Sequence, residues 1–398
     1  MLRTYSSANN GTRYYHKLCN IVYLAGLPNF WMEDLGYSET FVKYFDYFTK
    51  LVTGILYMFM VSEWAATFTQ HNLTPKQSSD SLLFNYAHPL LSSYRLIMIY
   101  HQDQFRELIF NLFVKLKEVF NEKNVEQEMI RKSKTFVVSF TIICSMTLVF
   151  YGFESFLQVL TTDATFTTVI TAWPDVEDKS TAAGVGRVIA YLIWWMLMSR
   201  IFASYIVVMS LMVALEYQYK NLREYFRSLQ EIFEEDLSQS EMEMKYEEGV
   251  KIGIRLHSET LNCARLAQET CSTIYCLQII LNITVLVSLM SQMLDSGRTV
   301  STVFTIVVTA VGTLLSTGVF MWTAGDVTVE AALLATDMYA SGWQNCYERA
   351  VSVRKLLTVA MAQAQRPVTI KGLGILEISY SAYLQIVKSS YSLFTMLY

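Results

Sequence analysis

The chain has 398 residues, of which 53% are hydrophobic and only 17% are charged, with a formal net charge of −4 and a mean hydropathy of +0.28. Soluble domains carry about a quarter charged residues, so this composition departs from theirs. There is no basic excess to bind nucleic acid, and we expect no nucleic-acid partner. Five histidines occur without metal-ligand spacing, and no nucleotide-binding or nucleophile motif is present, so we expect neither an enzyme nor a cofactor.

Two uninterrupted apolar runs indicate the class of protein. Residues 271–294 and 299–323 contain no Asp, Glu, Lys or Arg. Each run is long enough to cross the hydrocarbon core of a bilayer as a helix, which needs about 20 residues. The sequence therefore predicts an all-α, polytopic membrane protein.

Five further segments are expected to cross the membrane, which makes seven in all. They are 44–68, 81–100, 136–160 and 187–215 before the two apolar runs, and 373–397 after them. The second segment has the weakest pattern because His88, Pro89 and Arg95 interrupt it, and Pro89 is expected to kink it. The last segment contains Glu377 and Lys388.

Lysine and arginine are divided unequally between the loops. The stretches 1–41, 101–135, 216–270 and 325–366 hold 21 of them, whereas the alternate loops 69–80, 161–186 and 295–298 hold one each, namely Lys76, Lys179 and Arg298. Positively charged loops stay in the cytoplasm, so this bias predicts a cytoplasmic N-terminus. With seven crossings the C-terminus is then extracellular. This orientation argues against a G-protein-coupled receptor, which has its N-terminus outside.

Two further features agree with this orientation. All six cysteines fall in membrane or cytoplasmic stretches, where thiols stay reduced, so no extracellular disulfide is expected. Asn72-Leu73-Thr74 is a glycosylation sequon in the first predicted outer loop, which makes Asn72 the candidate glycosylation site.

The predicted cytoplasmic stretches are expected to be helical. Apolar residues recur at helical spacing from Leu222 to Phe233, so the fourth membrane helix is expected to continue into the cytosol. The stretch 327–365 contains no proline and only Gly342 as an interior break. These extensions are either solvated connectors or a packed anchor domain where subunits meet, and we favour the packed domain.

The expected domain boundaries follow from these segments. They are 1–43 for a cytoplasmic N-terminal segment, 44–215 for membrane helices one to four, 216–270 for a cytoplasmic helical extension, 271–323 for membrane helices five and six, 324–370 for a cytoplasmic anchor helix and 371–398 for a seventh helix.

The C-terminal part of the chain resembles that of insect odorant receptors. The residues that carry the resemblance are Trp343, Arg354-Lys355-Leu356-Leu357, Gln365-Arg366-Pro367 and Lys388-Ser389-Ser390-Tyr391-Ser392-Leu393-Phe394-Thr395. The resemblance implies a tetramer around a central pore, held by a cytoplasmic anchor domain, which conducts cations non-selectively when an odorant binds. The related gustatory receptor family, with a T-Y-x-x-x-x-x-Q-F ending, is the alternative.

The resemblance also indicates which kind of subunit this is. The chain lacks the long second cytoplasmic loop and the glutamine-containing ending of the family's co-receptor. It is therefore similar to an odorant-tuned subunit, which the resemblance implies forms a heterotetramer with co-receptor subunits. The expected location is the plasma membrane of olfactory sensory neurons, surrounded by lipid.

The last predicted helix carries a polar stripe. Gln385, Ser389, Ser392 and Met396 share one face, and Lys388 lies beside them. A polar stripe that turns apolar in its final turn suits a hydrated pore with a hydrophobic constriction, and aligning S-Y-S-x-F-T with the family implies that Met396 forms the gate. The alternative is that the serines pack helices together; the resemblance favours the pore.

The family's ligand pocket lies in the outer halves of the second, third, fourth and sixth segments, which are aromatic here. The candidate ligand-binding residues are Tyr86, His88, Val149, Gly152, Phe153, Phe156, Tyr191, Trp194, Trp195 and Met198. A small apolar cavity would bind a small, volatile, uncharged molecule mainly by burial. The alternative for each aromatic residue is ordinary packing or the aromatic belt of a membrane interface.

Two polar residues near this pocket carry expectations of their own. We expect His88 to be a hydrogen-bonded structural residue rather than a metal ligand. Glu154 is costly within an apolar run unless it is paired, and Arg187 or Arg200 is the expected partner.

Overall fold

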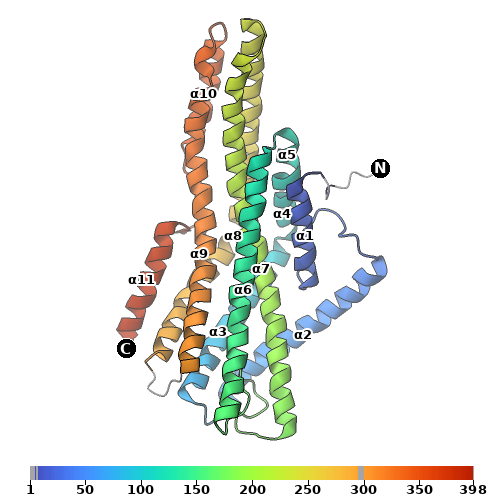
Figure 1. Cartoon of the computed structure of the whole chain (residues 1–398), viewed down its shortest axis with the longest axis vertical. Coiled ribbons are helices and arrows are strands. Elements are labelled where there is room, and N and C mark those ends of the chain that lie inside the picture. Colours follow the sequence, from blue (N-terminus) through green and yellow to red (C-terminus); the bar gives the residue numbers. More distant parts are fainter. Residues whose placement is uncertain (1–4, 6–7, 295–299, 398) are drawn as a thin grey trace.

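The computed structural model describes residues 5, 8–294 and 300–397. Arg298, which contributes to the charge bias between the loops, lies outside the described residues, as does Arg3. The described chain forms a long bundle of helices, with α2 splayed away from the bundle at one side and α11 standing at the other (Figure 1).

The structure assigns the following elements in chain order. They are α1 (Asn10–Leu24), α2 (Glu39–Thr69), α3 (Pro75–Tyr100), α4 (Gln102–Phe110), η2 (Asn111–Lys115), α5 (Leu116–Val119), α6 (Lys123–Thr161), α7 (Thr181–Ser228), η3 (Leu229–Glu234), α8 (Gln239–Gln292), α9 (Val300–Tyr339), η4 (Trp343–Asn345), α10 (Ala350–Ala364), β1 (Lys371–Gly372), β2 (Leu376–Glu377) and α11 (Tyr380–Leu397). The seven predicted membrane segments lie on α2, α3, α6, α7, α8, α9 and α11 in turn.

Five helical stretches among the described residues are long and apolar enough to cross a membrane. They are Glu39–Thr69, Lys123–Thr161, Thr181–Glu234, Gln239–Gln292 and Val300–Asn345. Helices α3 and α11, which contain polar residues, are not among these five. The fold is therefore all-α and suited to a membrane.

Helix α7 forms the centre of the bundle. It packs against α3, α6, α8 and α9, and the side chains of residues 201–219 are all buried. A helix that is apolar around its whole circumference can be surrounded by lipid or by other helices. The apolar run predicted a membrane helix here, and the structure shows that other helices surround it.

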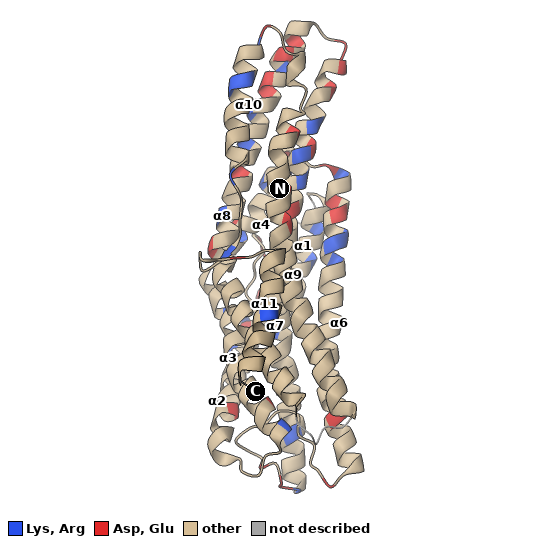
Figure 2. Ribbon diagram, turned by 90° about the vertical axis from the view of Figure 1, so that its left-hand side faces the viewer, with Lys and Arg blue, Asp and Glu red and all other residues tan. Residues whose placement is uncertain are grey.

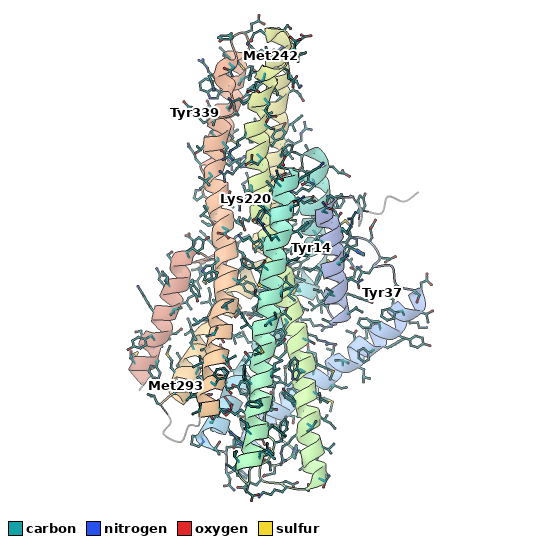
Figure 3. All side chains as sticks on the ribbon, viewed as in Figure 1. Tyr14, Tyr37, Lys220, Met242, Met293 and Tyr339 are labelled. Atoms are coloured by element: carbon teal, nitrogen blue, oxygen red, sulfur yellow. The ribbon has the colours of Figure 1, made fainter. Side chains whose placement is uncertain are left out.

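Several helices are longer than a bilayer is thick. Helix α8 has 54 residues, which at 1.5 Å per residue is about 80 Å, against about 30 Å of hydrocarbon. Met242 lies at one end of the bundle and Met293 toward the other (Figure 3). Lysine, arginine and acidic residues gather in the half that contains α10 and the start of α8, whereas the other half is largely uncharged (Figure 2).

The charged half is packed rather than loose. A Cβ atom added at Gly253 would lie 2.6 Å from Cζ of Phe226, so only glycine allows α7 and α8 to approach this closely. The Tyr246 and Ser341 hydroxyl oxygens are 2.6 Å apart, which ties α8 to the residues after α9. These contacts join α7, α8 and α9 beyond the apolar half.

The expected anchor helix 324–370 is interrupted, which corrects the prediction of a single helix. Helix α9 ends at Tyr339, and Gly342, at φ +96°, begins a turn that leads into α10. Few residues other than glycine adopt this backbone conformation. The chain therefore reverses, and α10 packs against α8 and α9.

The predicted last helix, 373–397, also begins later than expected. Lys371–Gly372 pairs in antiparallel fashion with Leu376–Glu377, and both Leu373 and Gly374 have positive φ angles at the turn between them. This small hairpin replaces the first turns of the expected helix. Helix α11 has 18 residues, about 27 Å in length.

Candidate ligand cavity and pore-lining helix

Helix α11 contacts its own chain along one face. It packs against α8 and α9, where Ile386 is 8% exposed and Ser390 is fully buried. The Tyr383 hydroxyl donates a hydrogen bond to the carbonyl oxygen of Leu314, at 3.2 Å. These residues recur every three or four positions, so they form a single inward face.

The stripe predicted from the sequence lies on the other face of α11. Gln385, Lys388, Ser389, Ser392 and Met396 are all exposed, and Met396 is 83% exposed. This face therefore carries mixed polar and apolar side chains and points away from the helices of its own chain. The structure brings the five predicted residues together on one surface.

A cavity of about 140 Å³ lies between five helices in the apolar half of the bundle. Its lining residues are Leu83, Phe84, Ala87, His88 and Leu91 from α3; Phe140, Cys144, Thr147, Leu148 and Tyr151 from α6; Trp194, Met198, Ile201, Phe202 and Tyr205 from α7; Gln278, Leu281 and Val285 from α8; and Thr309, Gly312, Thr313 and Ser316 from α9. Most of this surface is apolar, which suits a ligand held by burial.

Three of the ten residues predicted to bind ligand line this cavity. They are His88, Trp194 and Met198. Two others hold its wall: the Tyr191 hydroxyl donates to the carbonyl oxygen of Leu148 at 2.9 Å, and a Cβ atom at Gly152 would collide with that hydroxyl. Tyr191 and Gly152 therefore position the helices without lining the cavity.

The remaining predicted residues lie outside the cavity. Tyr86, Val149, Phe153 and Phe156 are between 39% and 52% exposed, and Trp195 is partly buried beside Tyr191. On α6 the buried face carries Leu148, Tyr151 and Ser155, which are each one position away from a predicted residue. A shift of one position turns a helical side chain by about 100°. Helical spacing identified residues that share a face, but it did not show which face is inside.

A buried hydrogen-bonded chain supports one wall of the cavity. Nδ1 of His88 lies 2.8 and 2.9 Å from the two carboxylate oxygens of Glu63. Nε1 of Trp194 donates to Nε2 of His88 at 3.0 Å. Since an indole N–H can only donate, Nε2 must accept, and the proton of a neutral His88 lies on Nδ1 and is donated to Glu63. His88 is thus a hydrogen-bonded structural residue, as expected, although the sequence did not identify Glu63 as its partner.

A charged cluster lies where α3 begins, α6 ends and α9 begins. Nζ of Lys76 is 3.1 Å from Asp80 and 3.2 Å from Glu154, and the hydroxyl of Thr302 donates to Glu154 at 2.8 Å. The expected partners of Glu154 were wrong. Arg187 donates to the backbone carbonyls of Asp175 and Asp178, and Arg200 donates to Thr53 and the Thr49 carbonyl.

One family model matches most of the chain. A family model described as 7tm Odorant receptor matches residues 83–391. The chain belongs to the odorant receptor family. The resemblance of its C-terminal residues is thereby confirmed, and the chain is an odorant receptor of the membrane-spanning type.

Solved structures of another odorant receptor share its fold. The insect olfactory receptor OR5 from Machilis hrabei is 13% identical, with a TM-score of 0.77 and 97% of each chain covered. The same receptor in complex with eugenol is also 13% identical, with a TM-score of 0.80 and the same coverage. No curated protein matches the chain. At this identity the likeness to the solved structures shows the fold alone.

The receptor's cavity also includes residues that the sequence reasoning missed. Helix α8 contributes Gln278, which was not expected because the pocket was assigned to other helices. Helix α9 contributes Thr309, Gly312, Thr313 and Ser316. Their spacing of three, one and three residues places them on one helical face, so a stripe of small and hydroxyl residues within an apolar run was the available signal.

Asn72 lies in the turn between α2 and α3 of the receptor. It is exposed and has a φ of +53°, and its side-chain amide donates to Glu177 at 3.3 Å. The described residues contain no group of three or more His, Cys, Asp and Glu side chains that could hold a metal ion.

Proposed function

We propose that this receptor is a subunit of an odorant-gated, non-selective cation channel. A small volatile molecule binds in the cavity between α3, α6, α7, α8 and α9, and copies of α11 from neighbouring subunits surround a shared pore. Gln385, Lys388, Ser389 and Ser392 line the pore, and Met396 forms its hydrophobic gate. Hydrophobic constrictions close pores by excluding water.

The two unlike faces of α11 carry this proposal. Ile386 and Ser390 are buried against the receptor's own helices, whereas Ser392 and Met396 are exposed. A helix facing lipid on its outer side would carry apolar residues there, because polar groups are costly in hydrocarbon. Serine, glutamine and lysine on the exposed face are better suited to water, which a pore between subunits supplies.

The cavity supports an uncharged ligand of small size. Its volume is about 140 Å³, close to the cavity of about 150 Å³ that binds benzene in an engineered protein. Glu63 and His88 are both held in the hydrogen-bonded chain with Trp194, so neither offers a free charge to a ligand. We assign ligand contact to His88, Trp194 and Met198, together with Tyr151 and Gln278.

The topology and partners belong to the same proposal. Seven helices, α2, α3, α6, α7, α8, α9 and α11, cross the plasma membrane with the N-terminus in the cytoplasm and the C-terminus outside. The packed half that contains α10 is the cytoplasmic anchor domain, and Asn72 is exposed to glycosylation outside. The receptor is the odorant-tuned member of a heterotetramer with co-receptor subunits in olfactory sensory neurons.

Cysteine substitution on the two faces of α11 tests the pore assignment. A charged, water-soluble thiol reagent should reach Ser392→Cys through the water of an open pore and reduce the odorant-evoked current in cells that also express the co-receptor. Ser390→Cys is the matched control, since Ser390 is two residues away on the buried face of α11. Its current should not change.

The rate of modification distinguishes a pore from an ordinary surface. Ser392→Cys should react faster while odorant is present, because opening admits the reagent. If Ser390→Cys reacts as fast as Ser392→Cys, or if complete labelling of Ser392→Cys leaves the current unchanged, the pore assignment is wrong. Labelling is read independently from a biotinylated form of the reagent, so a variant that makes no current is still informative.

A further inference from the structure

The hydrogen-bond donors around the cavity are already engaged within the protein. Nε1 of Trp194 donates to His88, and Nδ1 of His88 is bound to Glu63. The hydroxyl of Tyr151 donates to Asp80 at 3.4 Å. None of these strong donors points a free proton into the cavity.

The inner end of the cavity shows the same pattern. Gln278 accepts hydrogen bonds from the hydroxyls of Tyr205 and Tyr94. Its amide nitrogen donates to the hydroxyl of Thr317 at 2.9 Å and lies 3.5 Å from that of Ser316. The amide and both phenols are therefore satisfied without a ligand.

Three hydroxyl groups on α9 complete the polar lining, and we call Thr309, Thr313 and Ser316 the α9 hydroxyl strip. Thr309 donates to the carbonyl oxygen of Thr305 at 2.8 Å, Thr313 to that of Thr309 at 2.9 Å, and Ser316 to that of Thr313 at 2.9 Å. On α6, Thr147 likewise donates to Ile143 at 3.4 Å. Cys144 adds only a thiol, which is a weak donor.

A hydroxyl that donates within its own helix still has oxygen lone pairs to offer. The cavity therefore presents acceptors along α9 but no unengaged strong donor among its described lining residues. A ligand that donates a hydrogen bond can pair with the strip while every existing bond is kept. A ligand that only accepts must displace one of those bonds or remain unpaired in an apolar space, which costs binding free energy.

We propose that the cavity selects hydrogen-bond donors, namely small alcohols and phenols, over carbonyl compounds of the same skeleton, with Thr313 and Ser316 as the accepting residues. This inference rests on the proposed function, because it takes the cavity as the odorant site. The two kinds of ligand differ by one net hydrogen bond to the cavity, which corresponds to about a two- to tenfold difference in affinity.

Three probes with one carbon skeleton isolate this preference. Benzyl alcohol donates and accepts, benzaldehyde only accepts, and toluene does neither. Each is added to the purified full-length receptor, and binding is measured from the concentration-dependent rise in its melting temperature, since a ligand stabilises the folded state it binds. Benzyl alcohol should bind about two- to tenfold more tightly than benzaldehyde.

Substitutions in the strip should remove the preference without emptying the cavity. Thr313→Val replaces the hydroxyl with a methyl group and keeps the shape of the side chain. Ser316→Ala removes the hydroxyl oxygen, which is the only non-hydrogen atom lost. In the double variant the ratio of benzaldehyde to benzyl alcohol dissociation constants should fall toward one, while toluene binding is unchanged. Thr305→Val is the matched control, because Thr305 is a buried α9 threonine that also donates within the helix and does not line the cavity.

The outcomes separate this inference from the proposed function. The proposed preference for hydrogen-bond donors is wrong if benzaldehyde binds the unaltered receptor as tightly as benzyl alcohol or more tightly. It is also wrong if none of the probes binds, or if the ratio of the two dissociation constants is unchanged in the double variant. The comparison on the unaltered receptor does not depend on any variant folding. If benzyl alcohol binds with the expected preference but evokes no current together with the co-receptor, the selection stands and the channel proposal fails.

Discussion

At the scale of single residues, the apolar half of the receptor contains a buried carboxylate, that of Glu63, which is paired with His88. Glu63 and His88 are 1% and 2% exposed and lie within 2.8 Å of each other. Burying a carboxylate without a hydrogen bond costs several kcal/mol. The Glu63–His88–Trp194 chain therefore keeps a carboxylate beside the cavity at little cost to the fold.

Removing the middle residue of this chain should destabilise the receptor. His88→Leu leaves Glu63 buried without its partner, so we expect a loss of about 1–3 kcal/mol in the free energy of unfolding. The double variant Glu63→Leu with His88→Leu removes both polar groups and should recover most of the loss. Melting of the purified receptor in detergent measures the stability of the single and the double variant. Glu63→Gln keeps an acceptor for Nδ1 of His88, so it should lower the stability less than His88→Leu does. A double variant no more stable than His88→Leu alone would contradict this account.

At the scale of elements, the charged half of the bundle is held by acidic residues of α8 that bind the turn before α10. Burial opposes ionisation of Glu243, but the backbone N–H groups of Tyr347 and Arg349, each 2.7 Å away, outweigh it and lower its pKa. Glu247 is 2.8 Å from Arg349 and 3.1 Å from Lys251. Both interactions lower the pKa of Glu247 to about 2, and the hydrogen bond from Arg349 has the largest effect.

The lowered pKa of Glu247 predicts a pH-dependent difference in melting temperature between the unaltered receptor and Glu247→Gln. Glu247 stabilises the folded state fully above its ordinary pKa of 4.5, and that stabilisation is lost as the pH falls from 4.5 toward about 2. We therefore expect the unaltered receptor to melt at a higher temperature than Glu247→Gln at pH 7, and the gap to narrow as the pH is lowered through this range. Glu248→Gln is the matched control, because Glu248 is its exposed neighbour. A gap that is constant with pH would show that the carboxylate charge does not stabilise the turn.

At the scale of the whole molecule, the bundle is divided into a charged half and an apolar half (Figure 2). Ion pairs join the helices where these halves meet: Lys132 is 2.6 Å from Glu216 and 2.7 Å from Asp326, and Lys220, labelled in Figure 3, is 3.0 Å from Glu216. Water and lipid headgroups solvate such residues, whereas hydrocarbon does not. In the orientation that we propose, this boundary corresponds to the cytoplasmic surface of the membrane.

The orientation itself can be tested with epitope tags. On intact cells, antibody should label a tag fused after Tyr398 and should not label one fused before Met1. After the membrane is permeabilised, both tags should be labelled to the same extent. Labelling of the N-terminal tag on intact cells would reverse the orientation and support a receptor of the G-protein-coupled type.

The sequence by itself determined the class of fold, because apolar runs and loop charge are local properties of the chain. Residues 271–292 and 300–323 of the two apolar runs lie on α8 and α9, and the C-terminal motif predicted the family that the comparisons then confirmed. On α11, the spacing from Gln385 to Met396 correctly grouped the residues that share an exposed face. Periodicity is sufficient for such grouping because a helix repeats every 3.6 residues.

Only the tertiary structure decided which faces meet. Val149 and Leu148 are adjacent in an apolar run, yet the first is 45% exposed and the second is 1% exposed. In a membrane both lipid and protein favour apolar side chains, so composition does not distinguish the inside of a bundle from its outside. The partners of Glu63 and Glu154 could not be predicted for a related reason. Each ion pair or hydrogen bond joins two different helices, and the packing of those helices decides which side chains meet.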